Sequence, residues 1–87
     1  MNKQFINKQI ETILNNYIFE LMEPTTFDKI DEDIFTILSN NNIHHYDITI
    51  DPDYDNNSLT IDIKGNNVYG TEYKSTFKMV NSSILTS

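Results

Sequence analysis

The sequence contains no cysteine, arginine, tryptophan or alanine, and only two glycines and two prolines. Without cysteine, a disulfide scaffold, a thiolate zinc site and a cysteine nucleophile are all excluded. Without arginine, the chain lacks the bidentate contacts through which proteins read guanine and clamp phosphate groups. Gly65 and Gly70 both fall where turns are expected, so there is no glycine-rich phosphate loop. We therefore expect neither an enzyme nor a cofactor.

Long apolar runs are missing as well. No segment approaches the roughly 18 apolar residues that cross a bilayer, and the polar N-terminal residues lack the apolar core of a signal peptide. A soluble intracellular protein without a membrane partner is expected. The 87 residues are expected to form one domain over 1–87, with residues 81–87 as a frayed tail.

The net charge of −7 is spread unevenly along the chain. Residues 20–62 hold eleven of the thirteen acidic residues against a single lysine, Lys29, whereas residues 1–19 and 63–87 sum to +1 and +2. Direct nucleic-acid binding is not expected, because affinity for phosphates depends on lysine and arginine. The acidic stretch is either a solvated surface that keeps the protein soluble or a surface that imitates phosphate charge.

A first amphipathic helix is predicted over residues 3–22. Its apolar residues recur at the spacing of one helical face. Glu23-Pro24 ends it, because the residue before a proline is disfavoured in the helical region. The stripe consists of Ile6, Ile10, Ile13, Leu14, Tyr17, Ile18 and Leu21.

A second helix is predicted to follow at once. Either Thr25 or Thr26 is expected to cap its first turn. The asparagines at 40–42 are expected to end it, because asparagine tolerates the left-handed conformation of a C-terminal cap. Its buried stripe is expected to consist of Phe27, Ile30, Ile34, Ile37 and Leu38.

From about residue 44 onwards, apolar residues recur at every second position, which is the spacing of a strand and not of a helix. Alternating residues predict strands at about 44–51, 59–64 and 69–80, joined by turns rich in Asn, Asp and Gly. The expected fold class is therefore α+β, with two N-terminal helices packed on one face of a three-stranded antiparallel meander in two layers. The side chains expected to face the helices are Tyr46, Ile48, Ile50, Leu59, Ile61, Ile63, Tyr73, Phe77 and Met79.

The best metal candidate is the turn between the first two strands. Asp51, Asp53 and Asp55, with Asp62 at relative position 12, have the carboxylate spacing of a calcium loop. However, Asn56 stands where such a loop has glycine, aspartate replaces the bidentate glutamate, and strands flank the loop in place of helices. A turn rich in Asp and Asn also needs no metal. We expect no metal and keep these four carboxylates as weak candidates.

Partner contacts are the remaining function that the residues suggest. Two phenylalanines lie on the flanks of the helices, off the main stripes, and exposed aromatics are enriched at interfaces. A three-stranded sheet also leaves open edges at which another chain can add a strand. Lysines on the third strand either protect that edge or meet an acidic surface. The expected partner-binding residues are Phe19, Phe35, Lys74, Lys78, Asp31, Glu32 and Asp33.

Part of the chain carries an ordered set of short motifs. Met22-Glu23-Pro24-Thr25 precedes the second helix, the first strand carries Tyr46 and Asp51, and Asn56-Asn57 forms the turn before the next strand. Over residues 18–64, this order resembles the C-terminal domain of contractile phage tail sheath proteins. The resemblance implies a domain without catalysis that contacts its neighbours through strand exchange. The proline that the family has after the later strand is absent here, and residues 65–87 match poorly.

The predicted function is a non-enzymatic protein-binding or assembly subunit, a small phage virion or tail-associated structural protein that acts through its sheet edge and helix flank. Its partner would be a protein, in a homo-oligomer or a larger assembly, in the virion or the infected cytoplasm. Abundant Asn, Ile, Asp and Lys is typical of AT-rich coding, which is common among phages and some bacteria. The alternative is an acidic phage inhibitor that blocks a nucleic-acid-binding host enzyme by mimicking phosphate charge.

Overall fold

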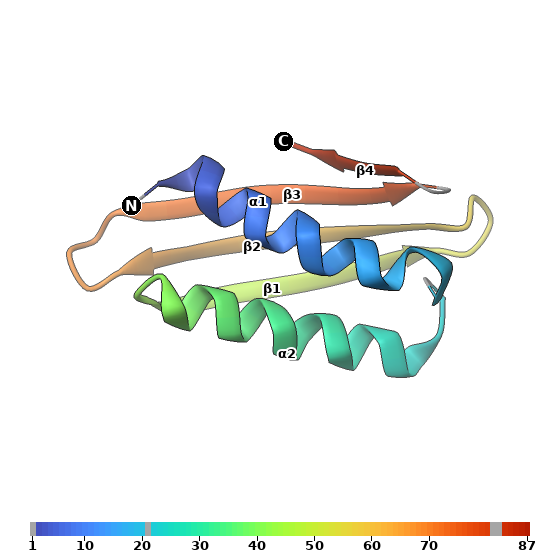
Figure 1. The fold of residues 1–87 in the computed structure, drawn as a ribbon, viewed down its shortest axis with the longest axis horizontal. Helices are drawn as coiled ribbons and strands as arrows, with labels where there is room; N and C mark the ends of the chain where they lie inside the picture. Colours follow the sequence, from blue (N-terminus) through green and yellow to red (C-terminus); the bar gives the residue numbers. More distant parts are fainter. Residues whose placement is uncertain (1, 21, 81–82) are drawn as a thin grey trace.

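The computed structural model describes residues 2–20, 22–80 and 83–87, and it forms two layers (Figure 1). One layer holds the helices and the other is an antiparallel sheet with the strand order β1-β2-β3-β4. The α+β class and the two-layer arrangement are therefore confirmed, but the sheet has four strands and not three. In chain order the elements are α1 (Lys3–Leu14), the 3-10 helix η1 (Asn15–Glu20), α2 (Pro24–Asn40), β1 (Ile43–Asp53), β2 (Ser58–Asn67), β3 (Glu72–Val80) and β4 (Ser83–Thr86).

The first helix is shorter than predicted. Oδ1 of Asn2 accepts a hydrogen bond from the Phe5 amide and caps α1. The helix ends at Leu14, where Asn15-Asn16 begins η1, because asparagine is a poor helix former and the chain tightens into 3-10 turns. Ile6, Ile10 and Leu14 are buried as expected, Tyr17 and Ile18 pack partly on the core, and Leu21 lies outside the described residues.

The second helix begins earlier than expected. Pro24 occupies its first turn, where a missing N–H costs nothing, and the extended Glu23 precedes it without a side-chain cap. The prediction that Thr25 or Thr26 caps the helix was wrong, because both lie inside it; Thr26 is buried and its hydroxyl has no hydrogen-bond partner. The predicted C-terminal stop is confirmed, since Asn42 has the left-handed φ of 63°.

The helices cover one face of a regular meander. Ile50 pairs with Ile61, and Ile61 pairs with Phe77, so the predicted alternation brings apolar side chains into register on the covered face. The pairing of β1 with β2 is irregular between Ile43 and His45, and Gly65 of β2 lies close to this part of β1. If residue 65 carried a Cβ atom, that atom would lie 2.8 Å from Cβ of Tyr46 and 2.9 Å from the His45 carbonyl oxygen, so this position has room only for glycine. The central strands β2 and β3 supply the buried Leu59, Ile61, Ile63, Tyr73, Phe77 and Met79.

The prediction of a frayed tail over residues 81–87 was wrong for residues 83–86. Residues 83–86 form β4, in which Ile84 pairs with Met79 and faces the core, while Leu85 pairs with Lys78 on the uncovered face. Residues 81 and 82 lie outside the described residues. Within the described ranges, no helix is long and apolar enough to span a membrane.

Candidate functional site

The sheet ends on one side in a long open strand. Within the described part of the chain, β1 pairs with β2 alone, and at eleven residues it is the longest strand. Its outer side therefore carries a row of backbone N–H and C=O groups, interrupted at Pro52, which has no N–H. The opposite edge strand, β4, has only four residues. β1 is the longer of the two edges at which a partner strand could add.

Helix α2 packs beside this edge and supplies an aromatic contact (Figure 1). The ring of Phe35 meets the ring of Tyr46 from β1, with centroids 6.1 Å apart and planes tilted by 59°. Phe35 is still 53% exposed, and Tyr46 is half-buried. Together with the three acids at 31–33 and Thr36, they line a groove of about 510 Å³. The edge is thus flanked by an aromatic surface with an acidic rim.

The three acids of this rim have different surroundings. Asp33 accepts a hydrogen bond from the Tyr17 hydroxyl, and this bond, with burial, raises the pKa of Tyr17 to about 12. Asp31 and Glu32 are exposed. Burial raises the pKa of Tyr46, and the negative charge of Asp31 raises it further, so Asp31 acts on the groove electrostatically. Asp31 and Glu32 remain available to a partner's positive charge.

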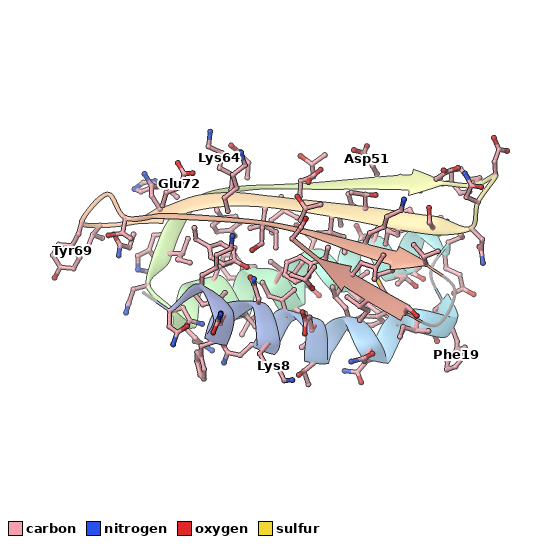
Figure 2. All side chains as sticks on the ribbon, turned by 90° about the horizontal axis from the view of Figure 1, so that it is seen from above. Lys8, Phe19, Asp51, Lys64, Tyr69 and Glu72 are labelled. Atoms are coloured by element: carbon pink, nitrogen blue, oxygen red, sulfur yellow. The ribbon has the colours of Figure 1, made fainter. Side chains whose placement is uncertain are left out.

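The structure separates the expected partner-binding residues into groups. Phe35 and the acids Asp31, Glu32 and Asp33 lie together along the groove. Phe19 is 93% exposed but lies at one end of the helical layer, on η1 (Figure 2). It is an exposed aromatic side chain that does not line the groove.

The two lysines also lie elsewhere. The expectation that they protect an edge was wrong for Lys78, because β3 pairs with β2 on one side and, over Phe77–Val80, with β4 on the other. Lys74 and Lys78 are on the uncovered face of the sheet, where Lys74 pairs with Lys64 in register. Figure 2 shows Lys64 on this face, away from the helices. They are therefore remote from the groove.

The aspartate-rich turn does not converge on one point. Oδ1 and Oδ2 of Asp53 accept hydrogen bonds from the backbone and side-chain amides of Asn56, which lower the pKa of Asp53. Asp62 lies within β2 and accepts a hydrogen bond from the Thr76 hydroxyl at 2.7 Å. Asp51 is on the uncovered sheet face and Asp55 is in the turn. Across residues 2–20, 22–80 and 83–87, no three His, Asp or Glu side chains are placed to hold a metal ion.

Charge is divided between the two sides of the molecule. On α2, four carboxylates against Lys29 leave a net −3, and β1 carries three more carboxylates, so this side has six net negative charges. On the other side, α1 and β3 each have two lysines and one glutamate, and β4 is uncharged, which leaves two net positive charges. The open edge β1 therefore lies on the acidic side.

Tyr46 was predicted to lie on the covered face of a half-buried strand, and this is confirmed, since it is half-buried and packs against the core. The sequence did not indicate that Tyr46 also contacts Phe35 beside an open edge. Its signal, an apolar position in an alternating strand, is the same for a central strand and for an edge strand. What distinguishes them is burial: Leu59, Ile61 and Ile63 on β2 are buried, whereas Tyr46, Ile48 and Ile50 on β1 are only half-buried. Strand order decides this difference, and it depends on contacts far apart in the sequence.

Comparisons with known proteins give no relative for this chain: no family model, no curated protein and no solved structure matches it. The resemblance to the sheath C-terminal domain therefore stays a prediction.

Proposed function

We propose that this chain is a non-enzymatic subunit that binds another protein by accepting a strand at the β1 edge, with the flank of α2 as a second contact. The observation that supports this most directly is the combination of an eleven-residue open edge with the exposed Phe35 beside it. Strand addition provides affinity through main-chain hydrogen bonds and specificity through side-chain contacts on the strand's two faces. The edge supplies the first and the groove supplies the second.

The wider setting of this proposal is an assembly. Neighbour contacts through an added strand are what the resemblance to the sheath C-terminal domain implies, and an AT-rich composition fits a phage gene. A small virion or tail-associated protein, held in a larger particle by such a strand, is the function we propose.

The acidic side supports a second candidate, an inhibitor that occupies the nucleic-acid site of a host enzyme. Six net negative charges on α2 and β1 would suit a basic binding cleft. This mechanism needs the carboxylates but not the backbone of β1. Two measurements separate the candidates. If nucleic acid displaces the partner, and if the partner does not change the hydrogen exchange rates of the β1 amides, the inhibitor is favoured over the assembly subunit.

Site-specific crosslinking tests the proposed surface. Phe35 is replaced by a photoreactive phenylalanine analogue, and Phe5 on α1, which is 55% exposed, provides a control of nearly equal exposure. In cells that make the native protein, we expect position 35 to give a discrete protein adduct and position 5 to give none. Equal labelling from both positions, or labelling from position 5 alone, would contradict the proposal.

A further inference from the structure

The two faces of β1 differ in chemistry. The side chains of Asp47, Asp51 and Asp53 lie on the uncovered face of the sheet and are all exposed. Between them, Ile48 and Ile50 point towards the helices and are half-buried. A row of carboxylates and a row of apolar side chains thus run along the same open edge.

A strand added to β1 would continue this pattern. Its residues must alternate between the two faces, because successive side chains of a strand point in opposite directions. On the uncovered face, every second residue would lie beside the carboxylates of Asp47 and Asp51. On the covered face, the intervening residues would lie beside Ile48, Ile50 and the exposed ring of Phe35. Unlike charges beside one another on neighbouring strands stabilise a sheet, and like charges destabilise it.

Resting on the proposed function, we propose that the strand accepted by β1 is an extended segment in which lysine or arginine alternates with apolar residues. Its basic residues pair with Asp47 and Asp51, and its apolar residues cover Ile48, Ile50 and Phe35. The exposed carboxylates of Asp31 and Glu32 on the rim extend the attraction for positive charge beyond the sheet itself.

A second copy of this chain fits the same edge poorly. Two β1 strands paired antiparallel about Thr49 would set Asp47 of each copy opposite Asp51 of the other. The other edge strand, Ser83–Thr86, offers four residues without a charge. Each copy also carries a net charge of −7, which opposes self-association. The acids therefore disfavour pairing with a second copy and favour a basic strand.

Synthetic peptides of the length of β1 test this inference. One peptide alternates lysine with valine, a second alternates glutamate with valine, and a third has the lysines and valines in two separate blocks. We expect the alternating lysine peptide to bind about tenfold tighter than either control at low ionic strength. Binding of the blocked peptide as tight as the alternating one would overturn the two-row pattern, and equal binding of the glutamate peptide would overturn the charge assignment.

Charge reversal then locates the contact. The double variant Asp47→Lys, Asp51→Lys should reverse the preference, so that the glutamate peptide binds tighter. The matched control Asp28→Lys, Asp55→Lys changes the net charge equally at two exposed positions outside the β1 acidic row and should keep the lysine preference. If both double variants shift binding equally, long-range charge explains the effect and the inference is wrong.

The proposed function and this inference can fail separately. If a bound partner slows amide exchange in β1 but the peptides show no charge preference, strand addition stands and the basic strand is overturned. If crosslinking at position 35 fails and β1 exchange is unchanged by any partner, the proposed function itself falls. Should the protein alone dimerise, and Phe35→Ser dissolve the dimer, the occupant is a second copy and the inference is contradicted.

Discussion

The Tyr73 hydroxyl donates a hydrogen bond of 2.6 Å to Oδ1 of Asn7, so one buried side chain of β3 is tied to α1 across 66 residues of sequence. Ser75 donates to the same oxygen at 2.7 Å. Tyr73 and Ser75 are both buried beneath the helices, where a polar group without a partner is costly. This bond network ties α1 to β3, and α1 in turn packs against α2.

Replacing Asn7 by alanine should therefore destabilise the protein. The hydroxyls of Tyr73 and Ser75 would lose their shared acceptor, and we expect the free energy of unfolding to fall by about 2 kcal/mol. Lys8→Ala, at the exposed neighbouring position of the same helix, should change it by less than about 0.5 kcal/mol. Urea unfolding of both variants measures the difference. Equal effects would show that the network contributes nothing specific.

The fourth strand can be tested with two adjacent residues. Ile84 faces the core and Leu85, which is 59% exposed, faces solvent. Ile84→Ala should lower the free energy of unfolding by about 1–2 kcal/mol, because it removes half-buried apolar surface. Leu85→Ala should leave it within about 0.5 kcal/mol. If the two substitutions have the same small effect in thermal unfolding, residues 83–86 do not form a packed strand in solution.

Alkaline pH should destabilise the protein through Tyr17. Its pKa is raised from 10.0 to about 12 by the hydrogen bond to Asp33 and by burial, so the folded state keeps a proton that the unfolded chain loses. This contribution is fully present below pH 10 and is lost as the pH rises through 12. The free energy of unfolding should fall across this window, and Tyr17→Phe should make the decline shallower.

Two other tyrosines, Tyr73 and Tyr46, also contribute to the loss of stability at alkaline pH. Burial also raises the pKa of Tyr73 and of Tyr46, so a residual decline in the same direction is expected in the Tyr17→Phe variant. Tyr54→Phe, which removes a tyrosine hydroxyl from an exposed residue of the β1–β2 turn, is the matched control. Identical slopes for the two variants between pH 10 and 12 in denaturant titrations would contradict the assignment to Tyr17.

The groove can be tested with a pair of phenylalanines of similar exposure. Phe35→Ser should weaken binding of the protein that crosslinks at position 35 by about 2 kcal/mol, because exposed aromatic anchors dominate interface energetics. Phe5→Ser should leave this affinity unchanged. Isothermal titration calorimetry measures both. The result that would count against the groove is an equal loss of affinity in the two variants.

Local rules predicted much of the fold. The apolar stripes of the helices and the alternation of β2 and β3 depend on neighbours a few residues apart, so Ile30, Ile61 and Phe77 were placed correctly in the core. The end of α2 was also predicted, because the left-handed conformation of Asn42 is a local preference.

The errors have non-local or competing causes. β4 is four residues long, too short for a period of two to be distinctive, and it forms because β3 offers an edge. Helix α2 begins at Pro24, because proline is favoured in the first turn of a helix. Thr25 and Thr26, which would be good caps by residue type alone, therefore lie inside the helix. The sequence also did not indicate that β4 pairs with Phe77–Val80, and so it placed Lys78 at an open edge and did not place Tyr46 beside Phe35.

The most direct test of the binding surface is amide hydrogen exchange with and without the protein that crosslinks at position 35. We predict that the amides of β1 that point away from β2, within Ile43–Asp53, slow on the order of tenfold or more in the complex, because they gain hydrogen bonds to the added strand. Amides of β4, Ser83–Thr86, should exchange at unchanged rates. Protection confined to β4, with β1 exchanging as in the free protein, would contradict strand addition at β1.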